Sequence, residues 1–410
     1  MARIAQDTVW TAIDIGTTKI CVLIAQHLGD NTFDVLGFGK TPSEGLSKGV
    51  VVDIAKTVGS IKRAVQEAEL MAGMTIDVAH IGVSGAHIKS LNSHGVVPIK
   101  RGEVRHEDIQ NVIASAQAVP VPEGQQILHV LPQYFVVDGQ EKVQDPLGMY
   151  GIRLEAQVHI ITGSVASVQN LIKCCEMAGV RAGDIVLEQL ASAEAVLTND
   201  ERELGVAVLD IGGGTSDLAL YQNGSIRHTM VLPIAGNHFT NDLAIGLHTT
   251  LRDAERVKRE HGLALLELLE DDDVLEVEMV QGNEKKIIFL KDLVSIIQPR
   301  SYELLSLVHE EVIKYHLQAF MRSGLVLTGG GSLLRGMKEL AEELFEVPVR
   351  IGVPSSSYAL PDVLQSPVYA TAYGLLVHVV KKEGGRAFTR EGYVVGRILD
   401  RMKSWVSDFF

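Results

Sequence analysis

The same short unit occurs twice in this chain and limits the folds that the chain can adopt. The unit is a hydrophobic run ending in Asp-Ile-Gly, then a tight turn, then a second hydrophobic run. Its copies are VWTAIDIGTTKICVLIA at residues 9–25 and VAVLDIGGGTSDLALYQ at residues 206–222. Asp210 follows Asp14 by 196 residues (210 − 14), so the unit is an internal repeat of strand, turn and strand. With 410 residues, two domains are expected.

The turn of each copy has the chemistry of a phosphate site. Glycine lets another group approach the backbone closely, and successive exposed N–H groups form a concave site for an anion. Asp14 and Asp210 would repel a phosphate unless a cation lay between, and their hard oxygen atoms suit Mg²⁺. We therefore predict Mg²⁺ together with a phosphate-bearing ligand. A plain glycine-rich hairpin is the alternative for either turn taken alone.

A third glycine turn occurs in GLVLTGGGS, residues 324–332. A strand at Leu325–Thr328 leads into Gly329–Gly331, and a helix is predicted from Ser332, as its cap, to Phe345. The N-terminus of that helix could take the negative charge of a nucleotide. The chain has no G-x-x-x-x-G-K-[ST] motif and no G-x-G-x-x-G between a strand and a helix. A P-loop NTPase is therefore excluded, and a dinucleotide-binding fold is not supported.

Composition excludes several other classes of protein. The formal net charge is −14, which argues against nucleic acid as the main partner. Three cysteines cannot form a secreted disulfide framework, and no cysteine and histidine pair has zinc-ligand spacing. Because the chain has no 18-residue apolar run and no signal-peptide core, we expect a cytosolic protein unless something anchors it at a membrane surface.

Alternating strand-like and helical segments predict an α/β fold. In the first half, strands are expected at 9–15, 19–26, 33–39, 78–84 and 184–188, with helices at 54–72 and 164–178. Residues 85–162 change character, and their short strands around one helix at 107–117 predict an inserted α+β subdomain. In the second half, we expect helical segments at 238–270, a hairpin at 274–290, a long helix at 293–314 interrupted by Pro299, and a final helix at 370–382.

The two hairpin turns, the later TGGG turn and the alternating elements resemble the actin/Hsp70/sugar-kinase superfamily. Four further features resemble the FtsA family of bacterial cell-division proteins: PIAGNHFTNDLA at 233–244 followed by AERVKREHG at 254–262, LEQLASAEAVL at 187–197, the insertion after the fourth strand, and an amphipathic C-terminus. The resemblance covers essentially the whole chain. It implies an actin-like ATPase fold, in which two ribonuclease-H-like domains flank a nucleotide cleft.

The resemblance also implies how the chain is divided. The first domain, 1A, would comprise residues 1–84 and 163–200, with the inserted subdomain 1C at 85–162. The second domain, 2A, would comprise residues 201–238 and 310–382, with subdomain 2B at 239–309. A linker at 383–393 and an amphipathic helix at 394–410 would follow.

Roles for particular residues in binding ATP and Mg²⁺ follow from the same resemblance. Asp14 and Asp210 would hold Mg²⁺, and Glu188 would orient the attacking water, although Gln189 stands where relatives in the superfamily often have proline. Glu255 would take the ribose hydroxyls and Lys258 would lie against the adenine, with a solvated helix face as the alternative for both. The other residues implied in nucleotide binding are Gly16, Thr17, Thr18, Lys19, Gly212, Gly213, Gly214, Thr215, Gly236, Asn237, Gly329, Gly330, Gly331 and Ser332.

The C-terminal segment YVVGRILDRMKSWVSDFF has the pattern of a helix that lies in a membrane interface. At 100° per residue, its apolar side chains fall within an arc of about 140°, opposite Arg397, Arg401 and Lys403. The alternative is a helix docked on its own domain. The residues predicted to face the membrane are Ile398, Leu399, Met402, Trp405, Val406, Phe409 and Phe410.

A member of the FtsA family would polymerise and tether the FtsZ ring to the inner face of the cytoplasmic membrane, as a peripheral protein at the division site. Its partners would be the FtsZ C-terminal tail, bound by 2B near Arg300, further copies of itself, the membrane and later division proteins. ATP would control conformation and assembly, with at most weak hydrolysis. Two alternatives share the fold: a small-molecule (sugar-type) kinase, and a relative of pilus-assembly ATPases, which would not be expected to have this tail.

Overall fold

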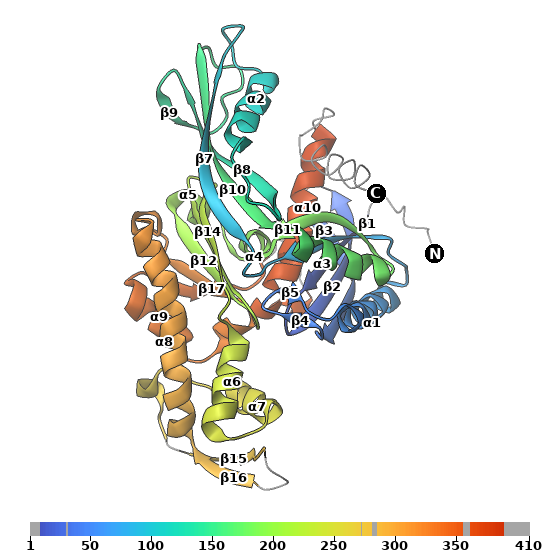
Figure 1. Ribbon diagram of the computed structural model, residues 1–410, viewed down its shortest axis with the longest axis vertical. Helices are drawn as coiled ribbons and strands as arrows, with labels where there is room; N and C mark the ends of the chain where they lie inside the picture. The colour runs from blue at the N-terminus through green and yellow to red at the C-terminus, as the bar shows by residue number, and fades with distance from the viewer. Residues whose placement is uncertain (1–8, 30–31, 272, 281–284, 356–360, 389–410) are drawn as a thin grey trace.

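The computed structural model describes residues 9–29, 32–271, 273–280, 285–355 and 361–388. Two α/β halves lie at the centre of an elongated molecule, and a subdomain extends from them at each end (Figure 1). The predicted membrane helix at 394–410 and the last part of the predicted linker lie outside the described residues. Among the helices of the described ranges, none combines the length and the apolar character needed to span a membrane.

The first half is built on a five-stranded sheet in the order β11-β6-β1-β2-β3. The first three strands form an antiparallel meander, while β6 runs parallel to β1 and β11 runs parallel to β6. The strands and helices predicted for this half are confirmed to within a few residues at their ends. Its elements are β1 (Val9–Ile15), β2 (Lys19–Gly29), β3 (Thr32–Pro42), β4 (Leu46–Ser47), β5 (Val50–Val51), α1 (Ile54–Ala72), β6 (Val78–Val83), α3 (Val165–Met177), β11 (Arg181–Leu187), α4 (Glu188–Val196) and α5 (Asn199–Leu204).

The second half repeats that sheet. Its strand order is β14-β13-β12-β17-β18, again an antiparallel meander followed by two parallel strands. Asp210 lies opposite Asp217 in the second meander, just as Asp14 lies opposite Cys21 in the first, so the predicted internal repeat is confirmed. The strands are β12 (Val206–Ile211), β13 (Ser216–Gln222), β14 (Ser225–Leu232), β17 (Leu325–Thr328) and β18 (Val349–Ile351).

Both faces of the second sheet are covered, which explains why all six residues of β12 are buried. Val206 and Val208 belong to a hydrophobic core that continues into the first half. Leu209 and Ile211, on the opposite face, belong to a second core that includes residues of the outer helices. A strand buried on both sides is expected to be apolar throughout, so the single carboxylate of β12, Asp210, is an exception to that pattern.

The insertion forms a separate four-stranded sheet in the order β7-β10-β8-β9, with a small core of its own under α2. It also contacts the second half, because the side chains of Ser90 and Gln133 donate hydrogen bonds to the backbone carbonyls of Thr229 and Ile226 in β14. The insertion therefore bridges the two halves. Its elements are β7 (Lys89–Pro98), α2 (His106–Gln117), β8 (Gln125–Val137), β9 (Gln140–Val143) and β10 (Arg153–Ser164).

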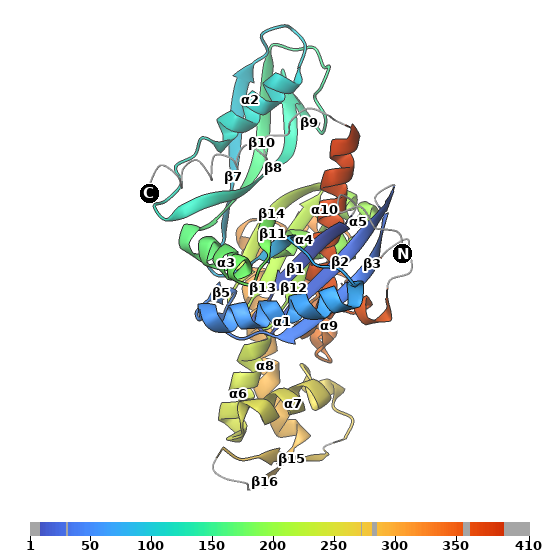
Figure 2. The same ribbon diagram turned by 90° about the vertical axis from the view of Figure 1, so that its right-hand side faces the viewer.

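At the opposite end, a helical subdomain with one hairpin extends from the second half (Figures 1 and 2). The predicted hairpin is confirmed. The long helix α8 continues through Pro299 rather than being interrupted there, and it buries Leu293, Ile297 and Leu304 on one side. The elements are α6 (Gly236–Leu247), α7 (Leu251–His261), β15 (Val274–Glu278), β16 (Lys285–Phe289) and α8 (Leu290–Lys314).

Two helices cross between the halves. Helix α4 continues from the last strand of the first sheet and packs on β12 and β13, whereas α10 (Ala370–Phe388) follows the second sheet and packs on β1, β2 and β6. The backbones meet at Gly374, where a Cβ atom would lie only 1.7 Å from the carbonyl oxygen of Ala191. Glycine is required for so close an approach.

Two predicted boundaries near the C-terminus are wrong. The helix predicted from Ser332 begins at Met337, as α9 (Met337–Phe345), because residues 330–333 form a single 3₁₀ turn and Gly336 reverses the chain at φ 81°. A positive φ of this size favours glycine and ends the turn before the helix begins. In addition, α10 runs on to Phe388, so the first part of the predicted linker is helical.

Candidate nucleotide site

The two Asp-Ile-Gly turns meet face to face between the halves. A Cβ atom on Gly213 would lie 2.2 Å from Cγ2 of Thr18, and one on Gly214 would lie 2.3 Å from Oγ1 of Thr17. Any side chain at these two glycines would therefore collide with the opposite turn. The structure thus brings together Thr17 and Thr18 of the first predicted phosphate turn and Gly213 and Gly214 of the second.

Asp14 is buried at the end of β1 and pairs with a lysine from its own turn. Lys19 Nζ lies 2.5 Å from Asp14 Oδ2. Burial is the largest single influence and lowers the pKa of Lys19, but the charges of Asp14, Cys21 and Asp210 and the hydrogen bond to Asp14 together raise it. Lys19 therefore keeps its positive charge between the two halves, where it can neutralise a phosphate or the neighbouring carboxylates.

Asp210 is buried at the equivalent point of the second copy and accepts two hydroxyl hydrogen bonds on one oxygen. Ser192 of α4 and Thr371 of α10 both donate to Oδ2. Its other oxygen faces the third glycine turn, since a Cβ atom on Gly329 would lie 2.2 Å from Oδ1. Burial raises the pKa of Asp210, although the two hydroxyl groups act in the opposite direction.

Glu188 is the first residue of α4, at the point where the chain leaves β11. Its pKa is raised well above the ordinary value, first by burial and then by the charges of Asp14, Asp217 and Asp210. The side chain packs against Gly82 of the neighbouring strand, where a Cβ atom would lie 3.1 Å from Glu188 Cγ. The residue predicted to orient water thus lies in the carboxylate cluster between the two turns.

Sequence reasoning assigned no role to Asp217, although the motif contains it. Asp217 and Asp210 are cross-strand neighbours in the β12–β13 hairpin, so both carboxylates lie on one face of the sheet. Burial raises the pKa of Asp217 to about 7, while a hydrogen bond from Ser84 acts in the opposite direction. A second aspartate seven residues after the first, in an otherwise apolar strand, was the signal that could have revealed it.

The charge balance of this cluster fits a divalent cation. Four carboxyl groups, from Asp14, Glu188, Asp210 and Asp217, share the environment of one lysine, Lys19. Within the described ranges, no three histidine, cysteine or acidic residues are arranged to hold a metal ion by themselves. Mg²⁺ is commonly held by one or two carboxylates, several water molecules and the phosphates of its ligand, so these residues fit it.

The predicted ribose and adenine residues lie together at the start of 2B. Lys258 Nζ lies 2.5 Å from Glu255 Oε2 and donates a hydrogen bond of 3.0 Å to the carbonyl oxygen of Gly236. The backbone amides of Gly236 and Asn237 donate to the carbonyl oxygens of the second turn, at Gly212 and Gly213. These two amides therefore brace the turn rather than remaining available to a phosphate.

The third glycine turn does not form the N-terminus of an α-helix, and it contributes to the site through its close packing instead. Ser332 is buried and its hydroxyl donates to the carbonyl oxygen of Gly329 at 2.7 Å, so it does not cap α9. Gly331 packs against Ile211, with a Cβ atom 2.3 Å from Cγ2 of that residue. Gly330 is the open position of this turn, because the nearest atom that its Cβ would meet is 3.9 Å away.

Arg300, predicted to bind a peptide, lies on α8, outside the carboxylate cluster. Its Nε and one terminal nitrogen lie 2.6 and 3.1 Å from the carboxylate oxygens of Asp242 on α6, and it also pairs with Glu303. The guanidinium group is therefore held by two acids within 2B.

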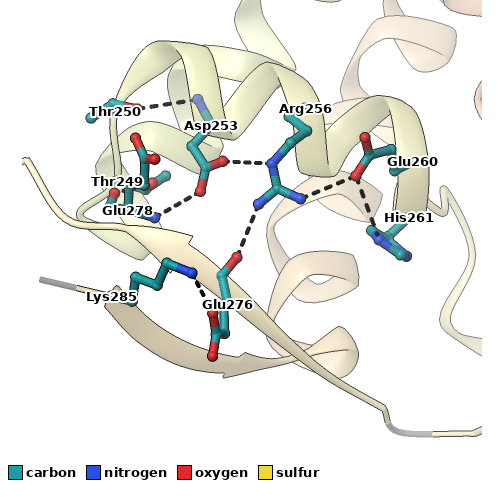
Figure 3. A network of polar contacts seen from close by, with 9 residues as sticks. All are labelled: Thr249, Thr250, Asp253, Arg256, Glu260, His261, Glu276, Glu278 and Lys285. Atoms are coloured by element: carbon teal, nitrogen blue, oxygen red, sulfur yellow. Dashed lines mark hydrogen bonds and ion pairs between the residues drawn. The ribbon is translucent and has the colours of Figure 1, made fainter. Parts of the chain in front are cut away.

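A polar network fastens the hairpin of 2B to α7 (Figure 3). Asp253 accepts hydrogen bonds from Arg256 and from the backbone of Glu278, while Arg256 reaches the carbonyl oxygen of Glu276 at 2.9 Å. A hollow beside it is lined by these same side chains and by Lys285, which pairs with Glu276. Because its charged groups already pair with one another, this network serves to hold the hairpin against α7.

Comparison with known proteins gives two matches to family models. The model described as "Cell division protein FtsA" matches residues 207–374, and the model described as "SHS2 domain inserted in FTSA" matches residues 85–162. The second match coincides with the insertion that changes character in the sequence and forms its own sheet in the structure.

Two curated relatives match over almost their whole length. This chain is 44% identical to the cell division protein FtsA of Pseudomonas aeruginosa over 417 aligned residues, which cover 100% of both chains. It is 39% identical to the cell division protein FtsA of Escherichia coli strain K12, with 97% of both chains covered.

Solved structures of lower sequence identity share the fold. A chain of the PilM–PilN type IV pilus biogenesis complex has a TM-score of 0.66 at 19% identity, and covers 90% of this chain and 98% of that one. MreB5 of Spiroplasma citri bound to ADP has a TM-score of 0.58 at 15% identity, and covers 94% of this chain and 100% of that one. A chain of the MamK double helical filament has a TM-score of 0.52 at 14% identity, with 90% and 98% covered. The predicted actin-like fold is confirmed.

Proposed function

This chain belongs to the FtsA family of bacterial cell-division proteins, and from that premise we propose that it binds ATP with Mg²⁺ between its halves and assembles on the membrane under the control of that nucleotide. The observation that carries this proposal is the pair of opposed Asp-Ile-Gly turns around a buried carboxylate cluster. Structural neighbours point the same way, since one is an MreB5 bound to ADP and another a MamK filament.

In the proposed complex, the two turns hold the phosphates from opposite sides. Gly16, Thr17, Thr18 and Lys19 contact them from the first half, and Gly212–Gly214 with Thr215 contact them from the second. Asp14 and Asp210 hold Mg²⁺, partly through water. The cation neutralises the charge of the phosphates and of the carboxylates together.

The purine nucleoside lies toward 2B and the third turn. Glu255 accepts hydrogen bonds from the ribose hydroxyls, and Lys258, already within 2.5 Å of Glu255, packs against the adenine. Gly236, Asn237 and the turn at Gly329–Ser332 complete the walls of the site. This assignment makes ATP the ligand and leaves no separate substrate pocket among the residues proposed.

Slow hydrolysis is part of the proposal. Phosphoryl transfer depends mainly on positioning and charge neutralisation, and Glu188 is the residue proposed to orient water. Burial, followed by the charges of Asp14, Asp217 and Asp210, raises the pKa of Glu188 well above the ordinary value. We therefore propose that Glu188 is a poor proton acceptor and that ATP serves chiefly to set conformation.

The test is calorimetric titration of ATP into the full-length chain, with and without Mg²⁺. Asp210→Ala should weaken Mg²⁺-dependent binding by at least about tenfold, as removal of a metal-binding group does. Asp34→Ala is the matched control, since Asp34 is an exposed acid on β3 outside the cleft. An Asp210→Ala variant that binds as the wild type does would contradict the site.

We further propose that the protein ties the FtsZ ring to the inner face of the cytoplasmic membrane at the division site, as a peripheral protein. The amphipathic pattern of residues 394–410 supports an anchor of moderate strength, because Arg397, Arg401 and Lys403 against Asp400 and Asp408 leave a charge of only +1. Assembly multiplies the tails, and avidity can exceed single-site affinity by about 10²–10⁴.

Trp405→Glu places a charge in the middle of the apolar arc and should release the protein from liposomes without changing its affinity for ATP. Ser404→Glu, on the polar face, is the matched control and should leave sedimentation with liposomes intact. Equal sedimentation of Trp405→Glu and wild type would mean that the tail is a docked helix. We also propose that copies of the chain associate through both domains, with the insertion at 85–162 contacting the neighbouring subunit. Normal ATP-dependent filaments on lipid after deletion of residues 85–162, seen by electron microscopy, would contradict this.

A further inference from the structure

Two hydroxyl groups meet at the carboxylate of Asp210. Ser192 Oγ and Thr371 Oγ1 both donate to its Oδ2, the latter at 3.0 Å, and the two hydroxyl oxygens lie 3.0 Å from each other. Ser192 is 0% exposed, Thr371 is 8% exposed and Asp210 is 7% exposed. The three side chains form one buried cluster, and neither hydroxyl belongs to the Asp-Ile-Gly motif itself.

The two hydroxyls come from the crossing helices, α4 and α10. Ser192 directly follows Ala191, whose carbonyl oxygen faces Gly374 at the point of closest approach. Thr371 lies one helical turn before Gly374 on α10. The helix crossing therefore sets where both hydroxyls lie, and each half of the molecule supplies part of the environment of Asp210.

The number of hydroxyl protons determines how the hydrogen bonds of this cluster are arranged. Each hydroxyl has a single proton to donate. When Asp210 is ionised, both protons point to Oδ2, and the carboxylate cannot rotate without breaking both bonds. Among the described residues, no donor is directed at Oδ1, which faces Gly329 instead. One carboxylate oxygen is therefore fixed by the protein, while the other keeps its capacity to accept.

We propose that Ser192 and Thr371 are positioning residues that orient the Asp210 carboxylate, so that Oδ1 is presented to the hydrated cation of the bound nucleotide. This proposal rests on the proposed Mg²⁺–nucleotide site. Partners of a metal-binding carboxylate orient it and tune its affinity for the metal, and losing one typically weakens metal binding about 10–100-fold. The role differs from a merely structural one, in which the hydroxyls only fasten α4 to α10.

The experiment compares ADP binding in Mg²⁺ and in EDTA by calorimetry, using the full-length chain. Thr371→Val keeps the shape of the side chain and removes its hydroxyl, while Ser192→Cys keeps the shape and offers only a weak S–H donor. Thr371→Ser keeps the hydroxyl and is the rescue variant. Thermal unfolding without ligand verifies that each variant is folded. The two hydroxyl deletions are independent of each other, so one folded variant is enough to test the proposal.

We expect Thr371→Val and Ser192→Cys to lose about 10–100-fold of the affinity measured in Mg²⁺, while their affinity in EDTA equals that of the wild type and Thr371→Ser binds normally in both. Equal losses in Mg²⁺ and in EDTA would assign the hydroxyls a structural role and overturn the proposal. So would normal Mg²⁺-dependent binding by both variants. If the wild type itself gains no affinity from Mg²⁺, the proposed function fails first, and the wild-type titration alone reveals it.

Discussion

Ser84 Oγ donates a hydrogen bond to Asp217 Oδ1 at 2.5 Å, and this bond joins the residue after β6 in the first half to β13 in the second. Both side chains are buried. The hydrogen bond favours the ionised carboxylate, burial favours the protonated form, and burial prevails, because the pKa of Asp217 is raised to about 7. The link between the halves therefore changes charge near neutral pH.

Asp217→Asn should stabilise the ligand-free protein increasingly as the pH rises. The pKa of Asp217 in the folded chain, about 7, exceeds its ordinary value of 3.8. The contribution of its protonated carboxyl group to the free energy of unfolding is therefore complete below about pH 4 and is lost as the pH approaches 7. Asparagine does not titrate. The unfolding free energy of the variant relative to wild type should rise by up to about 1.4 kcal/mol per pH unit in that window, measured by urea unfolding without Mg²⁺.

Ser84→Ala is the informative companion of that variant. It removes the donor that favours the ionised carboxylate, so the loss of stability should extend to higher pH than in the wild type. A difference between Asp217→Asn and wild type that stays constant from pH 4 to pH 8 would mean that this carboxyl group does not titrate as inferred.

His159→Gln should make stability less sensitive to acid. His159 Nδ1 lies 2.7 Å from Asn92 Oδ1, which can only accept, so Nδ1 carries the proton and Nε2 accepts from Thr229 Oγ1 at 2.9 Å. This neutral ring is buried, and burial lowers its pKa from 6.5 to about 3, with a smaller contribution from His228. The folded state thus resists a proton that the unfolded chain accepts.

Stability from a neutral His159 is complete above pH 6.5 and is lost as the pH falls toward 3. The wild type should therefore lose up to about 1.4 kcal/mol per pH unit more than His159→Gln between pH 6 and pH 4. Denaturant unfolding at several pH values measures this, and the exposed His106, replaced by Gln, is the control. Parallel pH profiles for His159→Gln and wild type would contradict the inference.

Gly213→Ala should weaken nucleotide binding because the new methyl group would lie 2.2 Å from Cγ2 of Thr18 and force the two turns apart. Thr18→Ser removes that Cγ2 atom, so the double variant should recover part of the lost affinity. Calorimetry of ADP with Mg²⁺ measures all three variants. If Thr18→Ser gave no recovery, the loss would have to come from the backbone of the second turn rather than from the contact between turns.

Arg300→Ala should lower the affinity of 2B for the FtsZ C-terminal peptide if this surface binds it. The arginine is engaged by Asp242 and Glu303, so Asp242→Asn should free it and raise the affinity, by up to about fivefold for an ion pair worth roughly 1 kcal/mol. Lys285→Ala, an exposed lysine elsewhere in 2B, is the control in fluorescence anisotropy. Unchanged affinity in both Arg300→Ala and Asp242→Asn would move the site elsewhere.

Features that depend on one short stretch of sequence could be predicted, whereas features that arise from packing between distant segments could not. Asp14 and Asp210 could be found because each stands in an apolar strand before a glycine turn, and the repeat showed that the two turns have one design. The helix predicted from Ser332 was misplaced because the φ of 81° at Gly336, which separates the 3₁₀ turn at 330–333 from α9, could not be inferred from the sequence.

The partners of the carboxylates illustrate the second case. Ser84, Ser192 and Thr371 lie more than a hundred residues from one another. Ser84 is also that far from Asp217, and Thr371 from Asp210, and hydroxyl side chains are common in every part of the chain. Nothing local distinguishes these three. The roles of Ser192 and Thr371 arise only where α4 and α10 cross, and the role of Ser84 arises only where the end of β6 meets β13; no periodicity in the sequence specifies either contact.

The crossing of α4 and α10 also governs the order in which the molecule can be completed during synthesis. The sheet that begins at residue 9 is covered by a helix that begins at residue 370, and Tyr373, Leu375 and Leu376 belong to the same core as Ile13, Leu23 and Ile81. A ribosome must make nearly the whole chain before that core closes. Until α10 has been made, the nascent N-terminal half exposes the apolar face that this helix later covers.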